Sequence, residues 1–153
     1  MPGSGKSTVG KYLAKSLSRK FIDTDEEIVK QTGKEISEIF AEIGNEGFRK
    51  IEAEVIARVS SENQGSVIAT GGGAILRDEN VNALKRSGRL YFIDRPLADL
   101  LPTQDRPLAS STEAIRRRYE ERYHRYCAVC DTRIDVNGSA ERVAEAILTD
   151  FFS

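Results

Sequence analysis

The chain has 153 residues, of which 39% are hydrophobic and 31% are charged. This length suits one domain with an apolar core, and no apolar run approaches the length of a bilayer span. The net charge of −1 and the two cysteines exclude a nucleic-acid coat protein, which needs a basic face, and a fold held by disulfides. We therefore expect one reduced, cytoplasmic, monomeric domain over residues 1–153, with neither nucleic acid nor a membrane as partner.

Helical and strand patterns alternate along the chain. The spacing of apolar residues predicts helices over 6–18, 26–31, 37–40, 48–60, 80–87, 112–127 and 140–151, and a short one from Pro96 to Pro102. Short apolar runs predict strands over 20–22, 66–70, 89–93 and 132–136. Strands that alternate with helices predict an α/β fold of three layers, in which helices cover both faces of one parallel sheet.

A glycine-rich segment at the start of the chain is the strongest functional signal. It matches most of G-x-x-x-x-G-K-[ST], the phosphate-binding loop, or P-loop, of nucleotide-binding proteins. Backbone N–H groups of such a loop converge on phosphate, and the next helix offers its positive end to the same anion. The alternative is a glycine-rich turn that caps an ordinary helix. The predicted nucleotide-binding residues here are Gly3, Ser4, Gly5, Lys6, Ser7 and Thr8.

The first glycine of this motif would precede Met1, and so would the strand that delivers the loop. In a doubly wound sheet that strand is central and lies beside the point where ligands bind. We therefore expect that the first strand of the fold is missing from this chain and that the native protein begins upstream.

Two carboxylates follow the first predicted strand, in the sequence Asp23-Thr24-Asp25. At positions i and i+2 of a strand end, both side chains would point the same way. One carboxylate can hold Mg²⁺ through water, and the other can accept a hydrogen bond from a substrate hydroxyl. The alternative is an acidic cap that stabilises the next helix without further function.

Gly71-Gly72-Gly73 directly follows a predicted buried strand. Three glycines permit close approach of a ligand to the backbone, although a flexible turn would look the same. Arg49 lies at the start of an amphipathic helix and alone indicates little; Glu52, three residues later, could simply be its partner on the protein surface.

The segments GSGKST, FIDTDEEI, TGKEISEIF, GFRKIE, ATGGGAI and DRPLA occur in this order along nearly the whole chain. Together they resemble the shikimate kinase family. The resemblance implies a P-loop fold similar to that of nucleoside monophosphate kinases. It implies a phosphotransferase of aromatic amino-acid biosynthesis that uses ATP and Mg²⁺ to convert shikimate to shikimate 3-phosphate.

On the nucleotide side, the resemblance implies that Lys6 holds the transferring phosphate, that Ser7 ligates the metal, and that Asp23 acts on Mg²⁺ through water. It places a catalytic lid at about 102–112, in which Arg106 reaches over ATP.

On the acceptor side, the resemblance places a shikimate-binding region at about 24–52. Asp25 would bind the shikimate hydroxyls and act as the catalytic base. Arg49 and Arg122 would bind the carboxylate, and Gly72 would offer its backbone N–H. Two arginines suit a carboxylate because the guanidinium group binds it through two hydrogen bonds.

The lid departs from the family pattern, because Pro102 stands before Thr103 where the family often has an arginine. The arginines at 116–118 could replace the missing charge, although a solvated helix face is the preferred interpretation.

Two other functions fit parts of the sequence. One is a different small-molecule P-loop kinase, acting on gluconate or a nucleoside monophosphate. The other is a kinase-like binding protein without catalysis, which the missing strand and Pro102 leave open. His124, Cys127 and Cys130 also have a metal-like spacing, but a zinc site normally needs a fourth ligand and none is evident.

Overall fold

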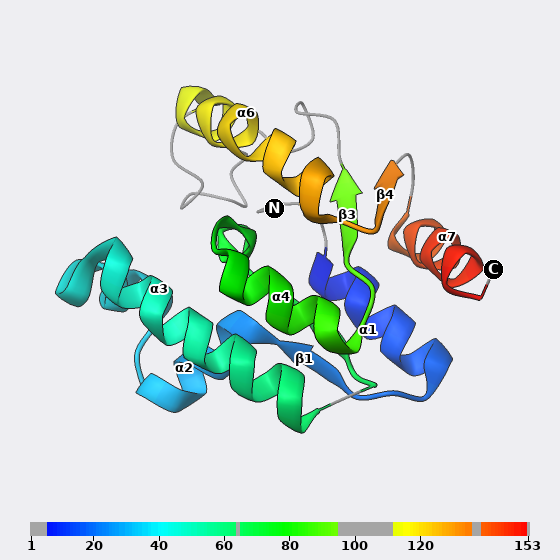
Figure 1. The fold of residues 1–153 in the computed structure, drawn as a ribbon, viewed down its shortest axis with the longest axis horizontal. Coiled ribbons are helices and arrows are strands. Elements are labelled where there is room, and N and C mark those ends of the chain that lie inside the picture. Colours follow the sequence, from blue (N-terminus) through cyan, green and yellow to red (C-terminus); the bar gives the residue numbers. More distant parts are fainter. Residues whose placement is uncertain (1–5, 64, 95–111, 136–138, 153) are drawn as a thin grey trace.

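A computed structural model describes residues 6–63, 65–94, 112–135 and 139–152, in which helices and strands alternate (Figure 1). The predicted elements within these residues are confirmed to within a few residues, and one 3₁₀ turn, η1, was not predicted. In this part of the chain no helix is long and apolar enough to cross a bilayer. The elements are α1 (Lys6–Leu17), β1 (Phe21–Asp23), α2 (Thr24–Thr32), α3 (Ile36–Glu62), β2 (Val67–Ala69), η1 (Ala74–Leu76), α4 (Asp78–Ser87), β3 (Tyr91–Asp94), α6 (Thr112–Val129), β4 (Thr132–Asp135) and α7 (Ala140–Phe151).

The segments predicted as separate helices at 37–40 and 48–60 form α3, which contains a break at Gly44. Gly44 has φ 73° and ψ −176°, a conformation that costs glycine little and other residues much more. The break lets the first part of α3 fold over α2, while the second part, from Phe48 onward, carries the buried residues Val55 and Val59.

Helices cover the strands on two sides, as the sequence predicts. On one side α1 and α7 pack together, with Val9 and Ile147 in their shared core and side chains of β2, β3 and β4 against it. On the other side α3 packs against β1 and β2, and α4 and α6 pack against β3. The three layers of the predicted architecture are therefore present.

The strands, however, form two parallel pairs rather than the one sheet predicted. β1 pairs with β2, with Phe21 opposite Val67, and β3 pairs with β4, with Tyr91 opposite Thr132. Within the described residues, no strand lies between β2 and β3, so their facing edges have no ladder partner. The predicted parallel pairing is therefore confirmed, but within the described residues the strands do not join into one sheet.

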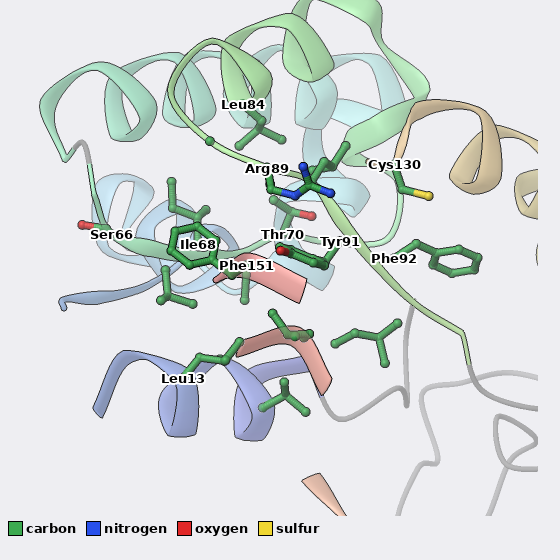
Figure 2. A pocket seen from close by; sticks show the side chains of 18 of the residues that line it. Leu13, Ser66, Ile68, Thr70, Leu84, Arg89, Tyr91, Phe92, Cys130 and Phe151 are labelled. Carbon is green, nitrogen blue, oxygen red and sulfur yellow. The ribbon is translucent and has the colours of Figure 1, made fainter. Parts of the chain in front are cut away.

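A cavity of about 300 Å³ separates the two pairs of strands (Figure 2). The cavity is lined by residues of β2, β3, α1 and α7, and also by Leu84 and Cys130. Figure 2 shows mainly apolar side chains around it, among them Leu13, Ile68 and Phe151. We call this cavity the strand slot, because it is bounded on two sides by unpaired strand edges.

Candidate active site

The first part of the site lies where α1 begins, at Lys6. The first turn of α1 contains no acidic residue, so the positive end of the helix is available to an anion. Ser7 donates a hydrogen bond from its hydroxyl to Oδ2 of Asp23 at 3.0 Å, while Thr8 is exposed. Gly3, Ser4, Gly5 and the side chain of Lys6 lie outside the described residues.

Asp23 ends β1 and caps α2. Its Oδ1 accepts hydrogen bonds from the N–H groups of Asp25 at 2.9 Å and of Glu26 at 3.4 Å. Asp25 therefore lies in the first turn of α2, and the predicted geometry of two carboxylates on one strand end is wrong. Asp23 therefore forms the acidic cap that the sequence allowed as an alternative. Its carboxylate satisfies helix N–H groups that would otherwise have no partner.

The Ser7–Asp23 pair fits a divalent cation. A hydroxyl oxygen and a carboxylate oxygen lie 3.0 Å apart, and Mg²⁺ prefers oxygen ligands, of which the protein usually supplies only one or two. No group of three or more His, Cys, Asp or Glu side chains that could hold a metal occurs among the described residues. Ser7 and Asp23 thus suit a cation whose remaining ligands come from phosphate and water.

The spacing of His124, Cys127 and Cys130 does not produce a metal centre in the described part of the chain. His124 and Cys127 are exposed at the end of α6, and Cys130 is half-buried. Burial raises the pKa of the Cys130 thiol, which makes it less reactive.

The three consecutive glycines bring the second part of the site together. A Cβ atom on Gly71 would lie 2.9 Å from Oδ1 of Asp25 and 3.4 Å from Oε2 of Glu52, and one on Gly73 would overlap the guanidinium of Arg49. The backbone here passes directly against three charged side chains, so glycine is needed for close approach. These contacts favour a close approach over a merely flexible turn.

Arg49 and Glu52 form a buried ion pair on α3. The Arg49 Nη1 donates to Oε1 of Glu52 at 2.8 Å, and the two side chains are 12% and 1% exposed. Oε2 of Glu52 has no hydrogen-bond partner among the described residues. Glu52 is thus buried beside Asp25, and our interpretation of it as a surface partner is wrong.

Burial raises the pKa of Glu52, and Arg49 opposes this effect through its hydrogen bond and its charge. The negative charge of Asp25 raises this pKa further, and the positive charge of Arg122 lowers it. Arg122 lies on α6, and its effect on the pKa of Glu52 is the smallest of these influences. The structure therefore brings Asp25 and Arg49 together at the glycines, while the binding roles of Asp25, Arg49, Gly72 and Arg122 stay predictions.

Sequence reasoning missed two residues of this region. Glu52 interrupts the apolar stripe of α3 between Phe48 and Val55. A charged residue within such a stripe indicates a buried charge, and this was the signal available in the sequence. Tyr126 on α6 donates a hydrogen bond to the carbonyl of Gly72 at 2.6 Å. No local sequence pattern indicates this contact, because the two residues are 54 positions apart.

The predicted lid lies almost wholly outside the described residues, since these end at Asp94 and resume at Thr112. Arg106 is among the residues left out, so its role stays a prediction. Arg116 and Arg117 are exposed on α6, which agrees with the interpretation of a solvated helix face.

The family model for shikimate kinase matches residues 2–151. A curated shikimate kinase of Clostridium botulinum (strain Eklund 17B / Type B) is 45% identical over 143 residues, which cover 91% of this chain and 85% of that protein. The shikimate kinase of Thermodesulfovibrio yellowstonii is 40% identical over 157 residues, with 97% and 90% covered.

Solved structures agree with these relatives. The shikimate kinase of Acinetobacter baumannii in complex with shikimate matches with a TM-score of 0.91 and 36% identity, over 99% of this chain and 89% of that one. The enzyme of Aquifex aeolicus matches with a TM-score of 0.83 and 37% identity, over 97% and 90%. The matched range includes both parts of the site described above, and the chain belongs to the shikimate kinase family, the phosphotransferases that its motifs resemble.

Proposed function

We propose that this chain transfers the γ-phosphoryl group of ATP to the 3-hydroxyl of shikimate and releases shikimate 3-phosphate and ADP. The observation that carries the proposal is that the carboxylate of Asp25 and the guanidinium of Arg49 both lie against the three glycines, while the charge of Arg122 acts on the adjacent Glu52. This arrangement suits an acceptor that has both hydroxyl groups and a carboxylate. It favours shikimate over a nucleoside monophosphate, whose phosphate and base need other contacts.

The acceptor half of the site supplies orientation and a base. Asp25 accepts a hydrogen bond from the substrate hydroxyl and takes its proton as the new bond to phosphorus forms. Arg49 and Arg122 hold the substrate carboxylate, which fixes the ring relative to Asp25. Because Glu52 holds Arg49 through a hydrogen bond of 2.8 Å, the guanidinium keeps one orientation before substrate arrives.

The nucleotide half of the site supplies positive charge. The N–H groups of residues 3–8 and the side chain of Lys6 hold the phosphates, and Arg106 of the lid stabilises the charge that develops on them. Ser7 and Asp23 would hold Mg²⁺, which neutralises phosphate charge when it is bound.

Expectations of a monomer, of a cytoplasmic location and of no nucleic-acid partner stay predictions.

An ADP-release assay with shikimate, gluconate and AMP as acceptors tests the proposed function. We expect turnover with shikimate only, and a decrease of about a hundredfold or more in kcat for Asp25→Asn, because a general base typically contributes that much. Glu27→Gln, on the same helix and ion-paired with Arg58 of α3 rather than with the glycine loop, is the matched control and should keep its activity. Equal turnover with gluconate, or an active Asp25→Asn variant, would refute the proposal.

We also propose that the complete fold has one continuous parallel sheet, in which a further strand fills the strand slot. The unpaired edges of β2 and β3 face this slot, and the side chains around it are mainly apolar. A strand parallel to both would end beside Asp23 and Asp94, at the edge where α1 begins (Figure 1). The occupant is therefore an extended apolar segment that leads directly into the phosphate loop.

Two N-terminal extensions of the chain test this proposal. One adds about six alternating β-branched and apolar residues, the usual length of a strand, followed by glycine. The other adds the same number of glycine and serine residues. We expect only the apolar extension to raise the melting temperature and the rate of turnover. If both extensions behave like the starting chain, the slot does not accept a strand.

A further inference from the structure

Helix α6 holds the loop of three glycines at two points. Tyr126 donates its hydroxyl to the carbonyl of Gly72 at 2.6 Å, and Arg125 donates Nε to the carbonyl of Ile75 at 2.7 Å. These two neighbouring residues bind both ends of a short segment that is distant in sequence. The loop that contacts Asp25 and Arg49 thus has its backbone fixed from the opposite side by α6.

The ring of Tyr126 has little freedom to move. It is 6% exposed, and it stacks on Phe92 of β3 with the ring centroids 4.8 Å apart. Ile75 and Val129 pack in the same cluster. A buried tyrosine needs a partner for its hydroxyl, and here the position of the ring directs that hydroxyl to Gly72.

The hydrogen bond to Gly72 also determines where the next N–H points. In a trans peptide the C=O of Gly72 and the N–H of Gly73 point in opposite directions, and no peptide bond of the described residues is cis. The N–H of Gly73 is therefore directed away from Tyr126. None of the described residues accepts a backbone hydrogen bond from it, while Gly73 itself lies against the guanidinium of Arg49.

A peptide between two glycines rotates easily, because neither residue has a Cβ atom to restrict φ and ψ. Without an external contact this loop would sample orientations in which the carbonyl of Gly72, rather than the N–H of Gly73, faces the acceptor. A carbonyl there would repel the carboxylate and compete for the hydroxyl groups of a bound acid.

We propose that Tyr126 is a positioning residue, which holds the Gly72 carbonyl so that the N–H of Gly73 faces the acceptor beside Arg49. The inference rests on the proposed function, because it concerns the same acceptor site. Tyr126 acts through the loop backbone and touches no substrate atom. A role in core packing alone would require the ring but not the hydroxyl.

Tyr126→Phe removes the hydroxyl and keeps the ring. We expect the KM for shikimate to rise about tenfold, in line with the loss of one buried hydrogen bond, while the KM for ATP stays unchanged. Tyr123→Phe is the matched control on the same helix: its hydroxyl bonds Asp94 at 2.9 Å, away from the glycines. This variant should leave the KM for shikimate unchanged.

Amide NMR of uniformly ¹⁵N-labelled protein gives a second measurement that does not depend on activity. We expect the Gly73 amide resonance to shift and broaden in Tyr126→Phe and to stay in place in Tyr123→Phe. An unchanged KM for shikimate with an unchanged Gly73 resonance in Tyr126→Phe would refute the inference, as would an equal rise in both KM values. If the starting protein shows no transfer to shikimate, the proposed function fails, whereas the NMR comparison still tests the position of the loop.

Discussion

The buried ion pair of Arg49 and Glu52 allows a quantitative test by the substitution Arg49→Met. Glu52 is 1% exposed, and its second oxygen has no hydrogen-bond partner among the described residues. Methionine keeps much of the side-chain length and removes the charge, so the carboxylate stays buried without its cation. Loss of one partner from a buried pair costs about 3–5 kcal/mol, and we expect a loss of unfolding free energy in that range at pH 8.

The loss should depend on pH. Burial already raises the pKa of Glu52, and Arg49 is the main group that lowers it, so Arg49→Met raises this pKa further. A carboxyl whose pKa is higher in the folded than in the unfolded protein binds more protons when folded, so stability falls as the pH rises above the unfolded value of about 4.3. The variant should therefore lose less stability at pH 5, where Glu52 is closer to protonation, than at pH 8.

Urea denaturation at both pH values measures these free energies, with Glu52→Gln and the double variant Arg49→Met/Glu52→Gln for comparison. The double variant should be more stable than Arg49→Met at pH 8, because it removes the buried unpaired charge. A loss below about 1 kcal/mol for Arg49→Met at pH 8 would refute the reasoning, because it would mean that the burial of Glu52 is not costly. An equal loss at both pH values would show that Glu52 does not titrate as argued.

Three further predictions concern single contacts. Gly73→Ala puts a Cβ atom onto the Arg49 guanidinium, so calorimetry should show that shikimate binds at least about tenfold more weakly. The control Gly88→Ala, whose Cβ atom would meet no atom closer than 3.9 Å, should bind shikimate normally. Ser7→Ala removes the hydroxyl beside Asp23, so the Mg²⁺ concentration for half-maximal turnover should rise severalfold with the KM for shikimate unchanged; an unchanged Mg²⁺ titration would argue against a metal at this pair. Ser139→Ala removes the side-chain cap of α7, a hydrogen bond of 3.3 Å from the N–H of Arg142, and should lower the unfolding free energy by about 1 kcal/mol in urea without changing either KM.

The helices and strands could be predicted because their signals are local. The apolar spacing of α1 and α7 and the short apolar runs of β1 and β2 locate these elements almost to the residue. Gly44 marks the break in α3 because its left-handed conformation is one that glycine adopts at low cost. The shared role of Asp25 and Arg49, which the structure places at the same glycines, was predicted through the family resemblance and not from spacing alone.

The errors concern interactions between distant parts of the chain. Whether Glu52 is on the surface depends on how α3 packs against α2 and the glycine loop, which an i, i+3 pair cannot show. The position of Asp25 was wrong because β1 ends at Asp23, and the helix that follows starts at once. Sheet pairing is similarly non-local. The incomplete phosphate-loop motif predicted a missing strand, but the alternation of elements could not locate the gap between β2 and β3.

The two halves of the site depend on different parts of the fold. The acceptor half is built from α2, α3, α6 and the glycine loop, and the contacts of Asp25, Arg49 and Tyr126 with this loop lie within the described residues. The nucleotide half depends on the loop before α1, and a strand in the slot would end where that loop begins.

Calorimetry on the 153-residue chain and on its apolar extension separates these contributions. We expect shikimate to bind both with similar affinity, and ATP to bind the extended chain more tightly. If ATP binds both equally, the phosphate loop holds its shape without a strand behind it, and the slot has no part in nucleotide binding.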